Sequence, residues 1–89
     1  MYQREVVLYT RSRSLRCWRA KRFLRRQGYR YEVVDTTDNP ELVAELSESV
    51  QHRVALPYVF VDHRPVGGFR EIRALAGSGA LAHLLREDL

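Results

Sequence analysis

The residue types most able to carry out chemistry in this chain stand close together, at Ser14 and Cys17. Cys17 is the only cysteine, and three residues before it, where a Cys-x-x-Cys redox pair would have its first thiol, stands Ser14. A thiol near the start of a helix is favoured as thiolate, because backbone N–H groups stabilise negative charge there. A serine hydroxyl has no comparable route to ionisation without a nearby base, and no histidine is placed in the sequence to supply one. The pair therefore predicts a sulfur-handling site whose leading nucleophile position holds a hydroxyl.

Both residues have several interpretations. Ser14 is an N-cap residue, a hydrogen-bonding partner for the sulfur of a bound thiol, or an engineered replacement for cysteine. Cys17 is a small buried apolar side chain, a surviving reactive thiol helped by Arg13 and Arg16, or a redox sensor that forms a mixed disulfide. The sequence leaves these alternatives open.

The elements that position this pair follow from the hydrophobic pattern. An apolar run over 5–9 predicts a strand buried on both faces, and helical spacing over 15–27, closed by Gly28, predicts a helix. The later pattern predicts, in order, a strand over 29–35, a helix over 40–50, a strand over 58–61, a short strand ending at 66 before Gly67-Gly68, and a helix over 69–86 interrupted at 77–79. The order β-α-β-α-β-β-α predicts a four-stranded mixed sheet with helices on both faces, as in the thioredoxin fold.

Length and composition predict an ordinary soluble protein with one domain over residues 1–89. Apolar residues make up 45% of the chain and charged residues 29%. No apolar run approaches the roughly 20 residues that span a bilayer, and the N-terminus lacks the apolar core of a signal peptide. With one cysteine and three scattered histidines, we expect a cytoplasmic protein without a metal site.

Charge is distributed unevenly along the chain. Residues 1–31 hold ten basic residues and one acid, whereas residues 32–89 hold five basic residues and ten acids, so +9 and −5 sum to +4. Fourteen of the fifteen basic residues are arginine, which suits bidentate contact with carboxylate or phosphate. The basic first helix is either a solvated face or a docking surface. As a docking surface it would give the protein an alternative function, that of a non-catalytic module that binds an acidic protein or nucleic acid.

Taken together, several segments resemble the glutaredoxin family over nearly the whole chain. The matching stretches are 6–10, 17, 20–21, 23–24, 28–32, 35, 39–42, 56–62, 67–69, 74–75 and 78–81. The resemblance implies a thioredoxin-like fold and a glutathione-dependent thiol–disulfide oxidoreductase, active in redox homeostasis and electron transport. In that family the nucleophilic cysteine occupies the position of Ser14. As a family member the chain is expected to be a glutathione-dependent disulfide reductase, whose activity with Ser14 is reduced, lost or dependent on Cys17.

The resemblance also implies a site for glutathione or a related low-molecular-weight thiol. Arg11 would meet a carboxylate of the tripeptide. Leu56, just before Pro57, would offer its backbone N–H and C=O to the cysteinyl part, as an added strand does. The Leu56–Pro57 bond is expected to be cis, as in the family.

The other wall of the implied thiol site comes from the segment after the last strand. Gly68 allows close approach of the ligand backbone, and Phe69 and Arg70 begin a helix whose N–H groups would receive the γ-glutamyl carboxylate. Three positions depart from the family pattern. Arg70 replaces a small or acidic residue, Ala55 a threonine, and Arg16 an aromatic residue. These departures bear on substrate preference.

The implied partners are glutathione or a related thiol and oxidised protein substrates. We expect a monomer that binds no membrane and has no need of nucleic acid. Some glutaredoxins bridge an iron–sulfur cluster between two monomers through the first cysteine of the motif. With Ser14 at that position, we expect no metal and no cluster.

Overall fold

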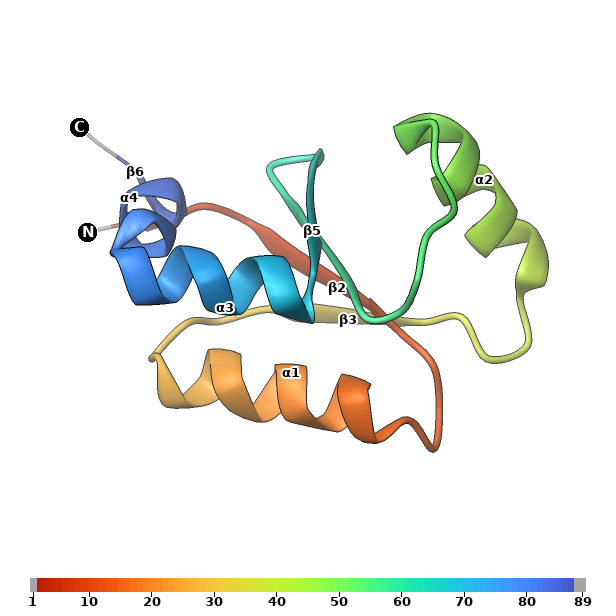
Figure 1. Ribbon diagram of the computed structural model, residues 1–89, viewed down its shortest axis with the longest axis horizontal. Helices are drawn as coiled ribbons and strands as arrows, with labels where there is room; N and C mark the ends of the chain where they lie inside the picture. Colours follow the sequence, from red (N-terminus) through yellow and green to blue (C-terminus); the bar gives the residue numbers. More distant parts are fainter. Residues whose placement is uncertain (1, 88–89) are drawn as a thin grey trace.

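A four-stranded sheet forms the centre of the computed structural model, which describes residues 2–87 (Figure 1). Its strands lie in the order β3-β2-β4-β5, with bounds β2 (Val6–Thr10), β3 (Glu32–Asp35), β4 (Tyr58–Val61) and β5 (Arg64–Gly68). The β2–β3 pair is parallel, and the β2–β4 and β4–β5 pairs are antiparallel. A separate short sheet pairs β1 (Tyr2–Gln3) with β6 (Arg86–Glu87), which the sequence pattern did not predict.

Helices cover both faces of the central sheet. They are α1 (Leu15–Arg26), α2 (Pro40–Val50), α3 (Phe69–Ser78) and α4 (Ala80–Leu85). The larger core cluster joins α1, α3 and α4 to one face, through Val6, Leu8, Ala20, Leu24, Val59, Val61, Ile72, Leu81 and Leu85. The smaller cluster joins α2 to the other face, through Leu46, Val54 and Tyr58. The predicted thioredoxin-like fold is confirmed.

Local signals at the helix ends behave as predicted. Gly28, with φ of +84°, follows the last turn of α1; its N–H donates to the carbonyl of Arg25, and the N–H of Tyr29 donates to that of Leu24. This pair of bonds is a Schellman motif, which satisfies two carbonyls at the helix end. At the start of α2, the side chain of Asn39 accepts a hydrogen bond from the N–H of Leu42 at 3.1 Å.

The predicted strand over 29–35 is wrong in its first three residues, because β3 begins only at Glu32, opposite Val7 of β2. Upstream of that point, the Gln3 side chain takes the place of a partner strand. The N–H of Arg30 donates to Gln3 Oε1 at 2.8 Å, and Gln3 Nε2 donates to the carbonyl of Arg30 at 2.6 Å. The alternating sequence pattern therefore begins upstream of the residues that pair with β2.

Other boundaries differ by a few residues. The first strand is Val6–Thr10 rather than 5–9, and only one of its faces is fully buried. The two glycines after Val66 do not end the fourth strand; β5 continues through Gly68, after a register shift between Val59 and Phe60. The last helix is broken only at Gly79, with φ of +83°, and it ends at Leu85 because Arg86 joins the short sheet.

Candidate functional site

Ser14 is the N-cap of α1. Its backbone is extended (φ −104°, ψ 118°), and its hydroxyl oxygen accepts a hydrogen bond from the N–H of Cys17 at 3.2 Å. Its carbonyl accepts the first helical bond, from the N–H of Trp18 at 3.0 Å. The serine therefore satisfies one of the N–H groups that a helix start leaves without an internal acceptor.

Cys17 lies inside the protein, with 2% of its surface exposed. Its Sγ accepts a hydrogen bond from the N–H of Arg11 at 3.4 Å. Burial on this scale favours the interpretation of Cys17 as a small buried side chain, because a thiol must reach solvent or substrate to react. By contrast, Leu15 and Trp18, two of the apolar residues at helical spacing within 15–27, are 63% and 53% exposed.

The turn before α1 is held by the loop that follows β3. The N–H of Ser12 donates to Thr37 Oγ1 at 2.8 Å, and the Ser12 hydroxyl donates to Asp35 Oδ2 at 3.2 Å. The hydroxyl and N–H of Thr37 both donate to Asp35 Oδ1. These bonds, led by the Thr37 hydroxyl, lower the pKa of Asp35 from its ordinary value. The ionised carboxylate therefore fixes the turn that carries Arg11 and Ser14.

The peptide bond between Leu56 and Pro57 is cis, as the resemblance implied. Pro57 is buried and directly precedes β4, where Tyr58 pairs with Gly68 of β5. A side chain on Gly68 would place its Cβ 3.3 Å from the Pro57 carbonyl oxygen. The glycine therefore brings the start of α3 close to the cis-proline segment.

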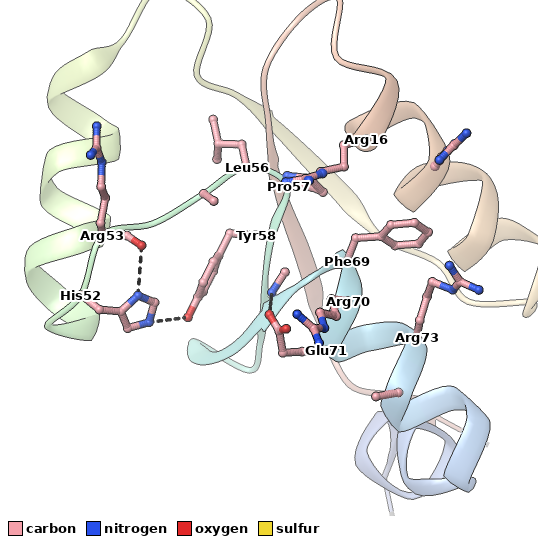
Figure 2. A pocket seen from close by; sticks show the side chains of 14 residues that line it. Arg16, His52, Arg53, Leu56, Pro57, Tyr58, Phe69, Arg70, Glu71 and Arg73 are labelled. Atoms are coloured by element: carbon pink, nitrogen blue, oxygen red, sulfur yellow. Dashed lines mark hydrogen bonds between the residues drawn. The ribbon is translucent and has the colours of Figure 1, made fainter.

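Glu71 closes the turn between β5 and α3, a role that the sequence analysis missed. Its Oε1 accepts a hydrogen bond from the N–H of Gly68 at 2.8 Å (Figure 2). Gly67 has φ of +140°, and a Cβ there would lie 2.8 Å from Cβ of Glu71. The N–H groups of Phe69 and Arg70 belong to the first turn of α3, where a helix leaves its N–H groups without an acceptor of its own. A glycine followed three residues later by glutamate resembles a capping box, which was the available signal.

Most of the predicted thiol-site residues come together in one groove of about 790 Å³ (Figure 2). Five of them line it: Leu56, Pro57, Gly68, Phe69 and Arg70. Arg11 lines a second groove of about 660 Å³, which shares Arg16, Arg53, Ala55 and Leu56 with the first. Ser14 and Cys17 line neither groove, although Arg16, between them in sequence, lines both.

Several groove residues were not predicted to form part of the site. They are Arg19, His52, Arg53, Tyr58, Glu71 and Arg73. The Tyr58 hydroxyl lies 3.4 Å from His52 Nε2, and His52 Nδ1 lies 3.1 Å from the carbonyl oxygen of Arg53. Burial, with a smaller effect of Glu71, raises the pKa of Tyr58. Apart from Glu71, no short motif marks these residues, because they come from segments that meet only in the folded chain.

Residues 2–87 show neither a metal-binding cluster nor a membrane-spanning helix. No three histidine, cysteine, aspartate or glutamate side chains of this range converge where a metal ion could be held. None of the described helices combines the length and the apolar character needed to cross a membrane.

Comparisons with known proteins agree with this arrangement. Residues 6–66 match the family model of glutaredoxin. A glutaredoxin of Pseudomonas aeruginosa is 34% identical over 80 residues, covering 90% of this chain and 94% of the relative. The solution structure of a Brucella melitensis glutaredoxin superimposes with a TM-score of 0.81 at 35% identity, covering 96% of this chain and 91% of that one. A buckwheat glutaredoxin–glutathione complex, at 22% identity, shares the fold with a TM-score of 0.83, over 92% of this chain and 76% of that one.

Proposed function

Since the chain belongs to the glutaredoxin family, we propose that it is a thiol–disulfide oxidoreductase domain that binds glutathione or a related low-molecular-weight thiol. One observation carries this proposal. Five residues predicted from two distant segments, 56–57 and 68–70, line a single groove. The relative from buckwheat forms a complex with glutathione, which supports the same ligand here. We also propose that residues 1–89 act as one domain.

Binding would use backbone groups more than side chains. Leu56 is half-buried at the end of a loop, and its N–H and C=O would pair with the cysteinyl part of the ligand as an added strand does. The N–H groups of Phe69 and Arg70 would receive one carboxylate at the positive end of α3. Arg11, in the adjoining groove, would receive the other.

Ser14 decides how far the reaction of the family proceeds in this chain. We propose that Ser14 stands at the position of the nucleophilic cysteine. In that reaction a thiolate attacks one sulfur of a mixed disulfide with glutathione, a new S–S bond forms, the old one breaks, and the departing thiolate takes up a proton. Ser14 provides no thiolate, and Cys17 is buried. Turnover is therefore lost, or it depends on a movement that exposes Cys17.

The test replaces the residue at the proposed position of the nucleophile, Ser14. Ser14→Cys should raise turnover of a glutathione mixed disulfide by about a hundredfold or more, a scale seen when a nucleophile is removed or restored. The variant keeps the backbone of α1, and Cys17→Ser in both backgrounds serves as the matched control. If Ser14→Cys stays at background although it binds glutathione, the position assigned to the nucleophile is wrong.

Intact mass measures the reactivity of Cys17 separately, since it is the only thiol of the chain. After exposure of the folded protein to oxidised glutathione, we expect no added glutathione, because the thiol is buried. The same exposure in denaturant should add one glutathione. A rapid adduct on the folded protein would show that Cys17 carries the activity.

We also propose that no iron–sulfur cluster bridges two copies of this chain, because Ser14 supplies no thiolate ligand. Anaerobic reconstitution with iron and sulfide should leave the visible absorbance unchanged. A coloured product that contains both iron and sulfide would refute this.

A further inference from the structure

Six arginines line the two adjoining grooves, and we call this set the arginine rim. They are Arg11 before α1, Arg16 and Arg19 on α1, Arg53 before β4, and Arg70 and Arg73 on α3. All six are exposed. No carboxylate within residues 2–87 forms an ion pair with any of them, and the single acid lining the grooves, Glu71, accepts the N–H of Gly68.

Glutathione leaves most of this charge unused. It carries two carboxylates, one of which would bind backbone N–H groups at the start of α3. An arginine fork binds one carboxylate in bidentate fashion, so one or two members of the rim are enough for the tripeptide. The remaining arginines present donors that match further carboxylates.

The surroundings of the rim favour a polypeptide as the source of those carboxylates. Phe69 lies among the rim arginines, and the guanidinium of Arg73 is 5.6 Å from the centre of its ring (Figure 2). Leu15 and Trp18, on the same helix as Arg16 and Arg19, are exposed apolar side chains. A polypeptide with both acidic and apolar residues complements such a surface.

The charge next to the rim disfavours a long polyanion. Helix α2, whose residues Pro40 and Val43 line the second groove, exposes Glu41, Glu45 and Glu48. These carboxylates would repel a nucleic acid that continued over α2, whereas a short acidic segment confined to the rim would not reach that helix.

We propose that the arginine rim binds an acidic segment next to the reactive cysteine of a protein substrate. The inference rests on the proposed function, because it describes the protein that is joined to glutathione in the mixed disulfide. The rim selects substrates by charge, and the backbone of the groove holds the thiol-bearing residue.

The first experiment measures binding without redox chemistry. Two fluorescent peptides carry a central S-methylcysteine flanked either by glutamates or by glutamines. In anisotropy titrations at low salt, the glutamate peptide should bind about tenfold more tightly, as expected from a few exposed ion pairs. The difference should shrink as salt screens the charges.

The second experiment assigns the preference to the rim. A triple variant, Arg19→Gln, Arg53→Gln and Arg73→Gln, removes rim charges and leaves every residue assigned to glutathione in place. The matched control, Arg25→Gln, Arg26→Gln and Arg64→Gln, removes the same charge from exposed positions that line neither groove. The rim triple should lose the preference for glutamate, and the control triple should keep it.

The outcomes distinguish a failure of this inference from a failure of the proposed function. Glutathione binding is followed on each protein by amide NMR shifts at Leu56 and Phe69. If glutathione binds there but the two peptides bind equally, the acidic-segment inference is overturned and the proposed function stands. A preference that survives the rim triple, or a single-stranded DNA that binds through the rim more tightly than the glutamate peptide, also overturns it. Loss of glutathione binding in the parent protein removes the proposed function itself.

Discussion

Helices α1 and α3 begin beside the same groove, and their first turns are capped in opposite ways. At α1 the side chain of Ser14 lies over the first turn and accepts the N–H of Cys17. At α3 a glycine without a side chain precedes the helix, and Glu71 turns back to accept its N–H. Both ends carry the positive pole of a helix. The α1 start is capped from outside the helix, by Ser14, whereas the α3 start is capped from within the helix, by the carboxylate of Glu71.

The largest expected effect concerns the glycine that lets Glu71 turn back. Gly67→Ala places a side chain at φ of +140° and 2.8 Å from Cβ of Glu71. We expect the free energy of unfolding to fall by about 2 kcal/mol, the scale of a strained backbone position. Chemical denaturation measures this loss of stability, and glutathione titration measures the accompanying loss of affinity for glutathione.

Gly77 offers a matched control for that substitution. It lies within α3, its φ is not positive, and a Cβ there meets nothing within 4 Å. Gly77→Ala should raise stability by about 0.5 to 1 kcal/mol, because alanine favours helix. Equal destabilisation by both variants would contradict the role given to Gly67.

The cap at α1 is expected to contribute less. Ser14→Ala removes the acceptor of the Cys17 N–H, and we expect a loss of about 1 kcal/mol in the free energy of unfolding. Ser14→Asp should retain the stability, because aspartate is an equally good N-cap. Thermal or urea unfolding of the parent protein and the two variants measures these differences. If Ser14→Ala is as stable as the parent protein, the cap is dispensable.

Glu71 tests whether the open start of α3 is the anion site. Glu71→Ala frees the N–H of Gly68 and removes the only carboxylate lining the groove. Stability should fall by about 0.5 kcal/mol, the low end for one hydrogen bond, while affinity for glutathione should rise. Calorimetric titration measures the affinity, with Glu71→Gln as the control that keeps an acceptor oxygen. Weaker binding by the alanine variant would place the carboxylate of the ligand elsewhere.

The smallest effect concerns the loop that holds the turn before α1. Hydrogen bonds from Thr37 lower the pKa of Asp35, so the contribution of the carboxylate is present above its unfolded pKa of about 3.9. That contribution is lost as the pH falls through the lowered pKa of the folded state. An NMR titration should place the midpoint for Asp35 below 3.9, with the amides of Ser12 and Thr37 shifting together. A higher midpoint, or amides that shift at different pH values, would contradict the coupling.

Much of the fold was predictable because its signals are local. Apolar periodicity gave the strand and helix order, and short-range polar bonds gave the ends of α1 and α2 at Gly28 and Asn39. The residues proposed for the thiol site were named through the resemblance, and five of them, in short segments around Leu56 and Gly68, line one groove. The Glu71 cap was also local, and its pattern was overlooked.

What the sequence determined by itself is therefore the order of the elements in and around the central sheet, and the presence of Ser14 three residues before the only cysteine. Only the tertiary structure decided that β3 starts at Glu32, that Cys17 is buried and that six arginines surround one pair of grooves. The physical reason is the range of the interactions. A cap or a periodic stripe joins residues a few positions apart. By contrast, Gln3 bonds to Arg30, and Arg16 and Arg70 line one groove, only after the sheet and helices have packed.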